Sequence, residues 1–399
     1  MHDKSAAGPA QISPFERRET AWQICLPYLQ ALAIYLSSRL LVFLGIAFGR
    51  VYVPAGHDIR LGGNSWYHHL LRWDSEWYKT IASAGYSYNG DPGQAQTVVF
   101  YPLYPGLSRL VGEILRIDVA DAMLLVANLA AAAAVVLLFK LVRERFDERT
   151  AYTTVALYAY FPASIFLSAG YTESLALLRM LAFFLCLARE RFWMAAIFAG
   201  LATATRSSGI VLLPVLLWEL WRCRPPRRFL IEAVPLSIVA TAGLWLFSLY
   251  LGLTFGHPLA FAEGQAAFQG NTTSVTRLLS ALTLQPFGRM DPSNISPAGL
   301  DQWFVLLGVA LIAYGWLTGI GRGMALFATL VLALPYLSVA GGPTGFTSMA
   351  RYNLVSFPLF LVMALLAARR PWVVPAIVGI FGGLLMMYSA LFAQWQWVG

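Results

Sequence analysis

A charged and aromatic segment, RWDSEWYKTIASAGY from Arg72 to Tyr86, stands out in a chain that is otherwise overwhelmingly apolar. On a helix its residues separate into an apolar face and a polar face. The apolar face contains Leu70, Trp73, Trp77 and Ile81, and the polar face contains Arg72, Glu76 and Lys79. Asp74 lies between the two faces, in line with Tyr78. We therefore expect an amphipathic helix at a membrane surface, with tryptophans at headgroup depth.

Asp74 is the side chain of this segment that is best suited to acid–base chemistry. Burial at an apolar boundary raises the pKa of a carboxyl group, and a raised pKa suits a general base. Glu76 and Lys79 are explained more simply as solvated charges, although Glu76 is retained as a substrate-binding candidate. The D-x-E spacing of Asp74 and Glu76 accommodates a divalent cation without demanding one, and no other metal-ligand pattern is evident.

Two further motifs supply aromatic rings and an acid. The run FYPLYPG offers Tyr101 and Tyr104 as stacking surfaces, or forms a structural turn. The run YTES places Tyr171 and Glu173 at the end of an apolar segment. Here the simpler explanation is a helix start, with a Thr or Ser as the cap and Glu173 near the positive end of the helix dipole.

Two more motifs supply arginines. The run TATRSSG carries Arg206 and Ser207 at a turn, which suits a phosphate. The run SMARYN carries Arg351 and Tyr352 at the start of another apolar segment, where an arginine that snorkels to the interface is the simpler explanation. Together the motifs offer a base, stacking surfaces for a sugar and two cations for a phosphate.

The composition indicates the class of protein that must position these residues. Of the 399 residues, 58% are hydrophobic and 12% are charged, whereas soluble proteins carry about 25% charged residues. The net charge of +8 arises from short basic clusters between apolar segments, as the positive-inside rule expects, so nucleic-acid binding has no support. We predict an all-α polytopic membrane protein.

Apolar segments of about 20 residues mark the expected membrane crossings. They cover residues 22–48, 119–141, 150–168, 173–188, 193–204, 209–221, 229–252, 300–318, 323–340, 352–368 and 372–393. These amount to about 11 crossings. The division of 193–221 into two short helices keeps both basic flanks on one side and puts Arg206 at the tip of a hairpin.

The basic loops also predict the orientation. Loops such as 140–149 and 222–228 mark the cytoplasmic side, so the N-terminus lies inside, with residues 1–20 as a disordered cytoplasmic tail. Residues 21–399 form a single transmembrane domain.

Two long loops, about 49–118 and 253–299, fall outside, and loops of this length usually carry function. The first of them bears the amphipathic helix. We expect a multi-pass protein of the plasma membrane with its site on the non-cytoplasmic face.

Four motifs together resemble one known family. The run RWDSEWYKTIASAGY with FYPLYPGL resembles the first motif of the PIG-V-type mannosyltransferases, of the GPI mannosyltransferase 2 kind. The runs FPASIFLSAGYTESLALL, GLATATRSSGIVLLP and ARYNLVSFPLF resemble later motifs of that family, in the same order, over roughly residues 70–360. Two departures are Ser208, where the family has Asn, and the D-x-E spacing, which not all members share. The chain looks like a prokaryotic-type member.

The resemblance implies a GT-C glycosyltransferase fold and an inverting transfer of mannose from a polyprenyl-phosphate donor. The acceptor would be a lipid or glycan, in a pathway similar to GPI-anchor biosynthesis, with membrane lipids as the surroundings. In that class the acid of the first outer loop is catalytic, which carries over to Asp74, with Trp73 beside it. Arg206 and Arg351 match family positions, and we expect them to bind the phosphate.

The remaining candidates would contact substrate. These are Trp73, Glu76, Tyr78, Tyr101, Tyr104, Tyr171, Glu173, Ser207 and Tyr352. The alternatives are a GT-C transferase of another polyprenyl-phosphate sugar, such as arabinose or an aminosugar, or a transporter of lipid or sugar. A transporter would carry charges near the centres of its spans; Arg39 and Arg179 are candidates, but no internal repeat accompanies them.

Overall fold

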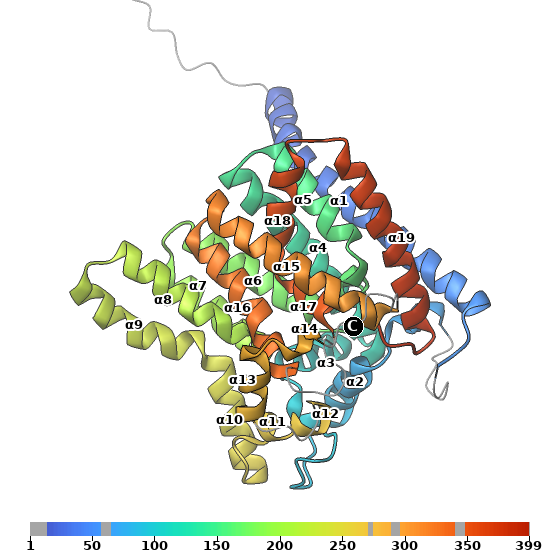
Figure 1. Cartoon of the computed structure of the whole chain (residues 1–399), viewed down its shortest axis with the longest axis vertical. Coiled ribbons are helices and arrows are strands. Elements are labelled where there is room, and N and C mark those ends of the chain that lie inside the picture. The colour runs from blue at the N-terminus through green and yellow to red at the C-terminus, as the bar shows by residue number, and fades with distance from the viewer. Residues whose placement is uncertain (1–13, 57–64, 270–273, 289–295, 340–347, 399) are drawn as a thin grey trace, which may run out of the picture.

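The computed structural model describes residues 14–56, 65–269, 274–288, 296–339 and 348–398. Within these ranges every regular element is a helix (Figure 1). The all-α expectation is therefore confirmed. Most of the expected tail lies outside the described residues, although helix α1 already begins at Pro14.

Four helices are long and apolar enough to cross a bilayer. They are α1 (Pro14–Tyr52), α4 (Val119–Arg145), α15 (Pro297–Thr318) and α19 (Val373–Ala393). Two bent helix pairs raise the number of candidate spans to six when each pair counts as one. Shorter helices occupy the other expected segments: α5 (Glu148–Tyr160), α6 (Glu173–Leu187) and α16 (Arg322–Val339). The chain is thus a multi-helix membrane protein, and the count of about 11 crossings stays a prediction.

Two segments expected as single helices are broken. The pair α9 (Pro226–Ala240) and α10 (Ala242–Phe255) bends by 53°, and the pair α17 (Met349–Val355) and α18 (Phe357–Ala367) bends by 81°. Pro358, in the first turn of α18, has no N–H, and its ring would clash with the carbonyl of Leu354 in a continuous helix. The short helix α17, which carries Arg351, therefore points away from the axis of α18.

The hairpin expected over residues 193–221 is confirmed as two short helices. They are α7 (Phe192–Thr203) and α8 (Leu212–Cys223), joined through the 3₁₀ turn η4 (Ser207–Val211). Gly209 lets this turn fold back, because a Cβ there would overlap the backbone of Ala202. At the other end Arg224 Nη1 lies 3.2 Å from Glu190 Oε2. The two basic flanks therefore meet, and Arg206 sits at the turn.

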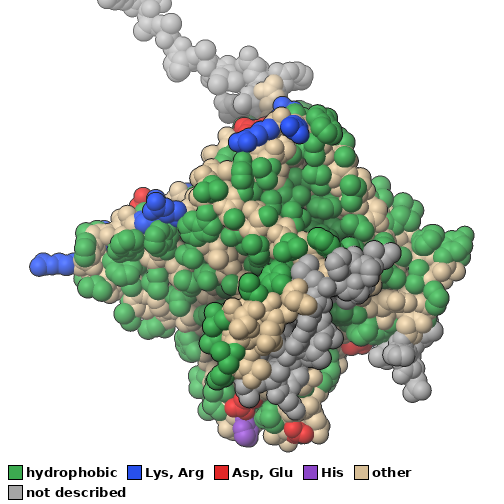
Figure 2. Space-filling model, viewed as in Figure 1, with side chains coloured by type: hydrophobic (Ala, Val, Ile, Leu, Met, Phe, Trp, Pro, Cys, Tyr) green, Lys and Arg blue, Asp and Glu red, His purple; other side chains and the backbone are tan. Residues whose placement is uncertain are grey.

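The basic loops gather at one end of the molecule. Arg189 joins Glu144 across 3.0 Å, so the C-terminal end of α4 and the loop after α6 are tied together. Figure 2 shows Lys and Arg side chains along the top and left of one face, and Asp, Glu and His at its lower tip. This separation agrees with the orientation predicted from the sequence, which remains a prediction.

The two long loops lie together at the other end. The first contains η1 (Trp66–Leu70), α2 (Asp74–Ala84), η2 (Thr97–Val99) and α3 (Leu103–Leu115). The second contains the short helices α11 (Ala260–Glu263), α12 (Ala266–Gln269), α13 (Ser274–Leu282) and α14 (Gln285–Gly288). Their rings pack against each other, as between Tyr101 and Phe261 (5.9 Å between centroids), and Figure 1 shows both loops at the lower end.

The prediction that Leu70 and Trp73 share one face of the helix in the first loop is wrong. Helix α2 begins only at Asp74 and buries Ser75, Tyr78, Ile81 and Ala82. Leu70 belongs to η1, and Trp73 has a φ of 57° that no α-helix tolerates. Leu70 and Leu71 are buried, and residues 71–73 form a turn between the end of η1 and the start of α2. The segment is a turn that presents Asp74 at the start of a helix.

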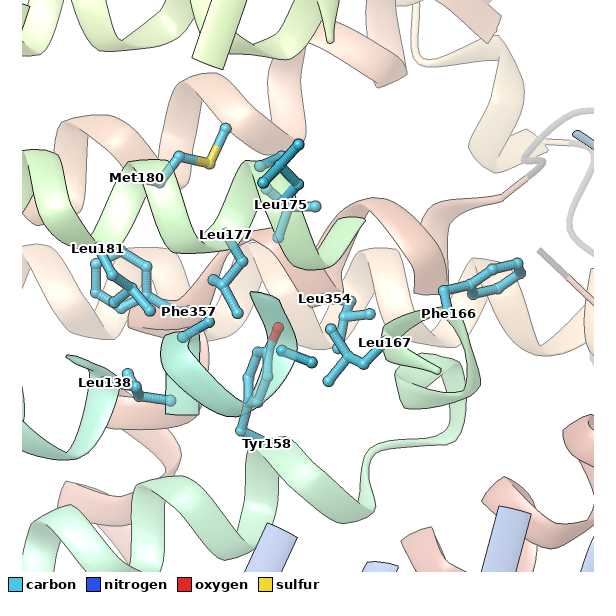
Figure 3. Packing of buried hydrophobic residues seen from close by; sticks show 14 of the residues in the cluster. Leu138, Tyr158, Phe166, Leu167, Leu175, Leu177, Met180, Leu181, Leu354 and Phe357 are labelled. Carbon is cyan, nitrogen blue, oxygen red and sulfur yellow. The ribbon is translucent and has the colours of Figure 1, made fainter. Parts of the chain in front are cut away.

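The core surrounds α4 and α6 and reaches the segments of interest. Figure 3 shows Leu175, Leu177 and Leu181 of α6 near Leu354 of α17 and Phe357 of α18. Lipid tails are as apolar as these side chains, so close packing rather than exclusion of water holds helices together in a membrane. This packing places the first residue of α6, Glu173, beside α17.

Candidate active site

Asp74 and Arg351 form an ion pair between segments that are 277 residues apart in sequence. Arg351 Nη1 donates to Asp74 Oδ2 across 2.9 Å. The Asp74 side chain is 23% exposed, whereas that of Arg351 is 10% exposed. The carboxylate at the start of α2 is therefore the accessible partner of the pair.

Glu173 links this pair to a second arginine. Its Oε1 lies 2.8 Å from Arg351 Nε and also accepts a hydrogen bond from Arg206. The Glu173 side chain is 1% exposed, and its Oε2 has no hydrogen-bond partner among the described residues. A carboxylate buried this deeply is stable only because cations compensate it.

Asp74, Glu173, Arg206 and Arg351 thus form a chain of alternating charge, which we call the four-charge cluster. Two carboxylates and two guanidiniums give it a formal charge of zero. Its members come from the start of α2, the start of α6, the turn after α7 and the short helix α17. The separate motifs of the sequence therefore meet in one place.

Aromatic rings enclose the cluster. The Arg351 guanidinium lies over Tyr171 (5.2 Å) and Phe166 (5.3 Å), and Arg206 lies over Tyr352 (5.9 Å). The Tyr171 hydroxyl accepts from the Asp74 N–H (3.2 Å) and donates to a backbone carbonyl of the same segment (3.1 Å). Tyr171 therefore fixes the backbone that carries Asp74.

Gly170 allows the segments that carry Asp74 and Glu173 to approach each other closely. The Gly170 N–H donates to the Leu70 carbonyl (3.1 Å), and a Cβ at Gly170 would overlap the Leu71 side chain. The segment that precedes Asp74 can therefore lie directly against the segment that precedes Glu173.

Asp301 of α15 caps the start of α17, the short helix that carries Arg351. Helix α17 begins after Ser348, whose side chain makes no cap hydrogen bond. Instead, Asp301 Oδ1 accepts from the Ala350 N–H (2.8 Å), and Asp301 is 3% exposed. A carboxylate at a helix start stabilises the free N–H groups there. Sequence reasoning missed Asp301; its one signal was an acid near the start of an apolar segment.

Three other candidates from the first loop are tyrosines that are buried among aromatic or helical neighbours. Tyr78 is buried between Tyr104 and Phe100, and burial followed by the nearby Asp74 charge raises the pKa of its phenol, so Tyr78 remains a proton donor. Tyr104 is fully buried and donates to the Met123 carbonyl (2.9 Å). Tyr101 packs in a separate cluster with Phe247.

Glu76 and Ser207 are not part of the four-charge cluster. Glu76 is half-buried, and no ion pair or side-chain hydrogen bond joins it to the four charged residues. Ser207 is exposed beside Arg206. Within the described ranges, no group of three His, Cys, Asp or Glu side chains is arranged to hold a metal ion. Asp74 is instead paired with the guanidinium of Arg351.

Two tryptophans near the cluster were also missed. Trp397 lies 5.2 Å from Trp73 and 5.9 Å from the Arg351 guanidinium, measured to ring centroids. Trp395 lies 5.0 Å from the Arg72 guanidinium. The signal was the run QWQW after the last apolar segment, which the spacing alone could not connect to Trp73.

Fold and site define a helical membrane protein with a partly accessible cluster of paired charges. Residues 58–224 match the family model described as mannosyltransferase (PIG-V). The matched region includes Asp74, Glu173 and Arg206, whereas Arg351 lies beyond it.

Several similar proteins are GPI mannosyltransferases. GPI mannosyltransferase 2 of Cryptococcus neoformans is 34% identical over 152 residues, which cover 35% of this chain and 34% of the relative. GPI alpha-1,6-mannosyltransferase 2 of Cricetulus griseus is 30% identical over 245 residues, which cover 57% and 47%. The human protein of the same name is 28% identical over 244 residues, with the same coverage. The similarity thus spans less than half the length of these relatives.

Among solved structures, the oligosaccharyltransferase of Archaeoglobus fulgidus aligns with a TM-score of 0.47 at 16% identity. The alignment covers 91% of this chain and 52% of that chain.

Proposed function

We propose that the protein is a membrane glycosyltransferase that moves a mannosyl residue from a polyprenyl-phosphate donor to a lipid or glycan acceptor. The observation that carries this proposal is the four-charge cluster, in which the partly exposed carboxylate of Asp74 is paired with Arg351 and linked through Glu173 to Arg206. A carboxylate can accept the proton of an acceptor hydroxyl, and arginines suit the phosphate of a donor. The match of residues 58–224 to the mannosyltransferase (PIG-V) family model supports the sugar and the donor class.

The proposed reaction is a single displacement. The acceptor oxygen forms a bond to the anomeric carbon of mannose while Asp74 takes the hydroxyl proton. The bond between the anomeric carbon and the phosphate oxygen breaks, and its electron pair leaves with the polyprenyl phosphate. Attack from the side opposite to the leaving group inverts the anomeric configuration.

The arginines would act mainly on the leaving group. The phosphodiester of the donor carries one negative charge, and the phosphate monoester that leaves carries up to two. Arg351 and Arg206 therefore bind the transition state, in which charge develops, more strongly than the bound donor. Glu173 would hold both guanidiniums in place, and its deep burial supports this role over direct contact with sugar hydroxyls.

The donor phosphate would also free the base. In the structure Arg351 binds Asp74, and a phosphate oxygen competes for the same guanidinium donors. Asp74 would then be free to accept a proton once the donor is bound. Trp73, Tyr171 and Tyr352 line the same region and are proposed substrate contacts, with Tyr78 behind them.

We propose that the site faces the non-cytoplasmic side of the plasma membrane and that the N-terminus is cytoplasmic. Support comes from the basic loops, which are joined by ion pairs and lie along the top and left of the molecule, away from the two long loops at its lower end (Figures 1 and 2). A lipid-linked donor can reach the site from the bilayer, so no nucleotide sugar is needed there.

The test is transfer of label from radioactive polyprenyl-phosphate mannose by the purified protein in lipid nanodiscs. Wild type should pass the label to a new lipid or glycan, and Asp74→Asn should not. In a parallel assay with the protein in sealed lipid vesicles, label that crosses the membrane unchanged would support transport instead. Transfer of label from polyprenyl-phosphate arabinose, but not from polyprenyl-phosphate mannose, would assign the donor to another sugar.

A further inference from the structure

A cavity of about 170 Å³ lies where the starts of α7 and α9 meet the end of α8. Three arginines and two glutamates line it, together with three apolar residues from the start of α7. Because about 10–15 Å³ is enough for one water molecule, the cavity has room for a group the size of a phosphodiester. The four-charge cluster and the proposed reaction use none of its residues.

The charged side chains of the cavity carry a net positive charge. Its arginines are Arg191, Arg224 and Arg228, and its acids are Glu190 and Glu232, so the formal charge is +1. Arg224 Nη1 lies 3.2 Å from Glu190 Oε2, and Arg224 Nε lies 3.5 Å from Glu232 Oε2. Arg228 Nε lies 2.5 Å from Glu232 Oε1. A ligand with one negative charge would neutralise the charge that remains.

Two of the arginines have donor groups that no described residue uses. Arg191 is exposed and makes no ion pair or side-chain hydrogen bond within the described ranges. Arg224 lies over the Phe192 ring (4.8 Å to the centroid), and its Nη2 donates to no residue there. The first turn of α7 also lines the cavity, and no side chain caps it, so its free N–H groups add donors. Guanidinium groups suit the oxygens of a phosphate.

An apolar surface adjoins the cavity. Trp193 and Met194 at its edge are 52% and 45% exposed, and Leu230 and Ile231 of α9 are 68% and 73% exposed. Tryptophan next to basic residues is typical of headgroup depth in a membrane. Figure 1 shows α7, α8 and α9 projecting together to the left, and Figure 2 shows apolar side chains over this projection. Acyl chains can therefore lie against this surface while a headgroup occupies the cavity.

We propose that the cavity binds the phosphodiester headgroup of an anionic phospholipid. Arg191 and Arg224 donate to the phosphate oxygens, and the acyl chains pack on Trp193 and the exposed face of α9. In the proposed orientation the cavity opens at the cytoplasmic leaflet, where basic pockets between helices bind anionic headgroups. The lipid joins α7 to α9 and so steadies the α7–α8 hairpin, which carries Arg206 at its other end.

The experiment measures binding of three probes to the purified protein in detergent, by native mass spectrometry and by the shift in Tm. The probes are dioleoylphosphatidylglycerol, which carries one negative charge, dioleoylphosphatidylcholine, which is zwitterionic, and glycerol phosphate, which has no acyl chains. The phosphatidylglycerol should bind about tenfold more tightly than the phosphatidylcholine and raise the Tm. Glycerol phosphate at the same concentration should do neither.

Arg191→Gln is the decisive variant. It should weaken binding of the phosphatidylglycerol about tenfold, because one charge-assisted hydrogen bond is lost. The Tm of the lipid-free protein should not change, since Arg191 is exposed. Arg224→Gln should weaken binding further, but it also removes the partner of two carboxylates and so lowers the lipid-free Tm.

Arg370→Gln is the matched control, because it removes the same charge from another exposed arginine, in the loop before α19. It should bind all three probes like wild type. Trp193→Ala should weaken binding of the phosphatidylglycerol.

Three results overturn the lipid site. They are equal binding of the two phospholipids, equal effects of Arg191→Gln and Arg370→Gln, or binding of glycerol phosphate as tight as that of the phosphatidylglycerol. The last result would assign the cavity to a free phosphate instead. Because no outcome depends on mannosyl transfer, the lipid site and the proposed function stand or fall separately.

Discussion

Two buried arginines, Arg39 and Arg351, are held in opposite ways. Arg39 on α1 makes its hydrogen bonds to backbone carbonyls and serine hydroxyls, including the Ser164 carbonyl (2.7 Å) and the Ala159 carbonyl (2.8 Å). Arg351 is paired with Asp74 and Glu173 and lies over aromatic rings. No carboxylate lies within ion-pair distance of Arg39 in the described part of the chain.

The contrast separates a structural charge from one that we propose to be functional. All three guanidinium nitrogens of Arg39 donate hydrogen bonds to α1, α5 and η3, so nothing remains to bind a ligand. Arg351 is neutralised by carboxylates, one of which is partly exposed and exchangeable for another anion. Arg39 therefore fastens α1 to the segment that leads to Tyr171, and this arrangement disfavours its role as a gating charge.

The largest effect is expected from Asp74→Asn. Loss of a general base lowers the rate of transfer about 10²- to 10⁴-fold, because the amide cannot accept the proton. The measurement is the kcat for mannose transfer, with thermal unfolding in detergent as a check on folding. Turnover within tenfold of wild type would exclude Asp74 as the base.

Matched substitutions of the two arginines test the comparison directly. Arg351→Met should lower kcat/KM about 10²- to 10³-fold through lost stabilisation of the leaving phosphate. Arg39→Met should leave the kcat of the folded protein within about threefold but lower the free energy of unfolding by about 1–3 kcal/mol, because buried acceptors lose their donors. The reverse pattern would contradict the assignment of the two roles.

Asp301→Ala should have a smaller effect on catalysis. Without its cap, α17 frays at the end that carries Arg351, so kcat/KM should fall about tenfold, mainly in kcat. Asp301→Asn, which keeps an acceptor oxygen, should restore most of the activity. A loss of stability with unchanged kinetics in Asp301→Ala would show a purely structural cap.

The smallest effect is expected from Glu76→Gln, which should change the thermal stability in a pH-dependent way. Burial raises the pKa of Glu76, opposed by smaller contributions from Lys79 and Arg72. A raised pKa means that the folded protein binds this proton more tightly than the unfolded chain does. The stability that the bound proton contributes is full below the unfolded pKa of about 4.3. It is lost as the pH rises through the pKa of Glu76 in the folded protein. Glu76→Gln should therefore raise the Tm by about 1 °C at neutral pH.

The control for Glu76 is the same variant at a pH of about 4, where the carboxyl is protonated and its Tm should match that of wild type. Transfer should stay within twofold at neutral pH, because Glu76 makes no bond to the four-charge cluster. A large loss of activity would place Glu76 in the substrate site after all.

Local signals in the sequence were sufficient for the elements and for most of the cluster. Apolar length predicted the spans, and basic flanks predicted the α7–α8 hairpin with Arg206 at its turn. They failed where tertiary contacts compete with local preference. The helical register at Trp73 was wrong because residues 71–73 form a turn between η1 and α2, and the 81° bend before α18 follows from Pro358.

The sequence by itself determined that this is a helical membrane protein and which acids, aromatics and arginines could do chemistry, because hydropathy and side-chain type are local properties. Only the tertiary structure decided which charges pair, since Asp74 and Arg351 meet across 277 residues of chain. It also brought Asp301 and Trp397 to the site. Their roles depend on packing between distant helices, which spacing along the chain does not encode.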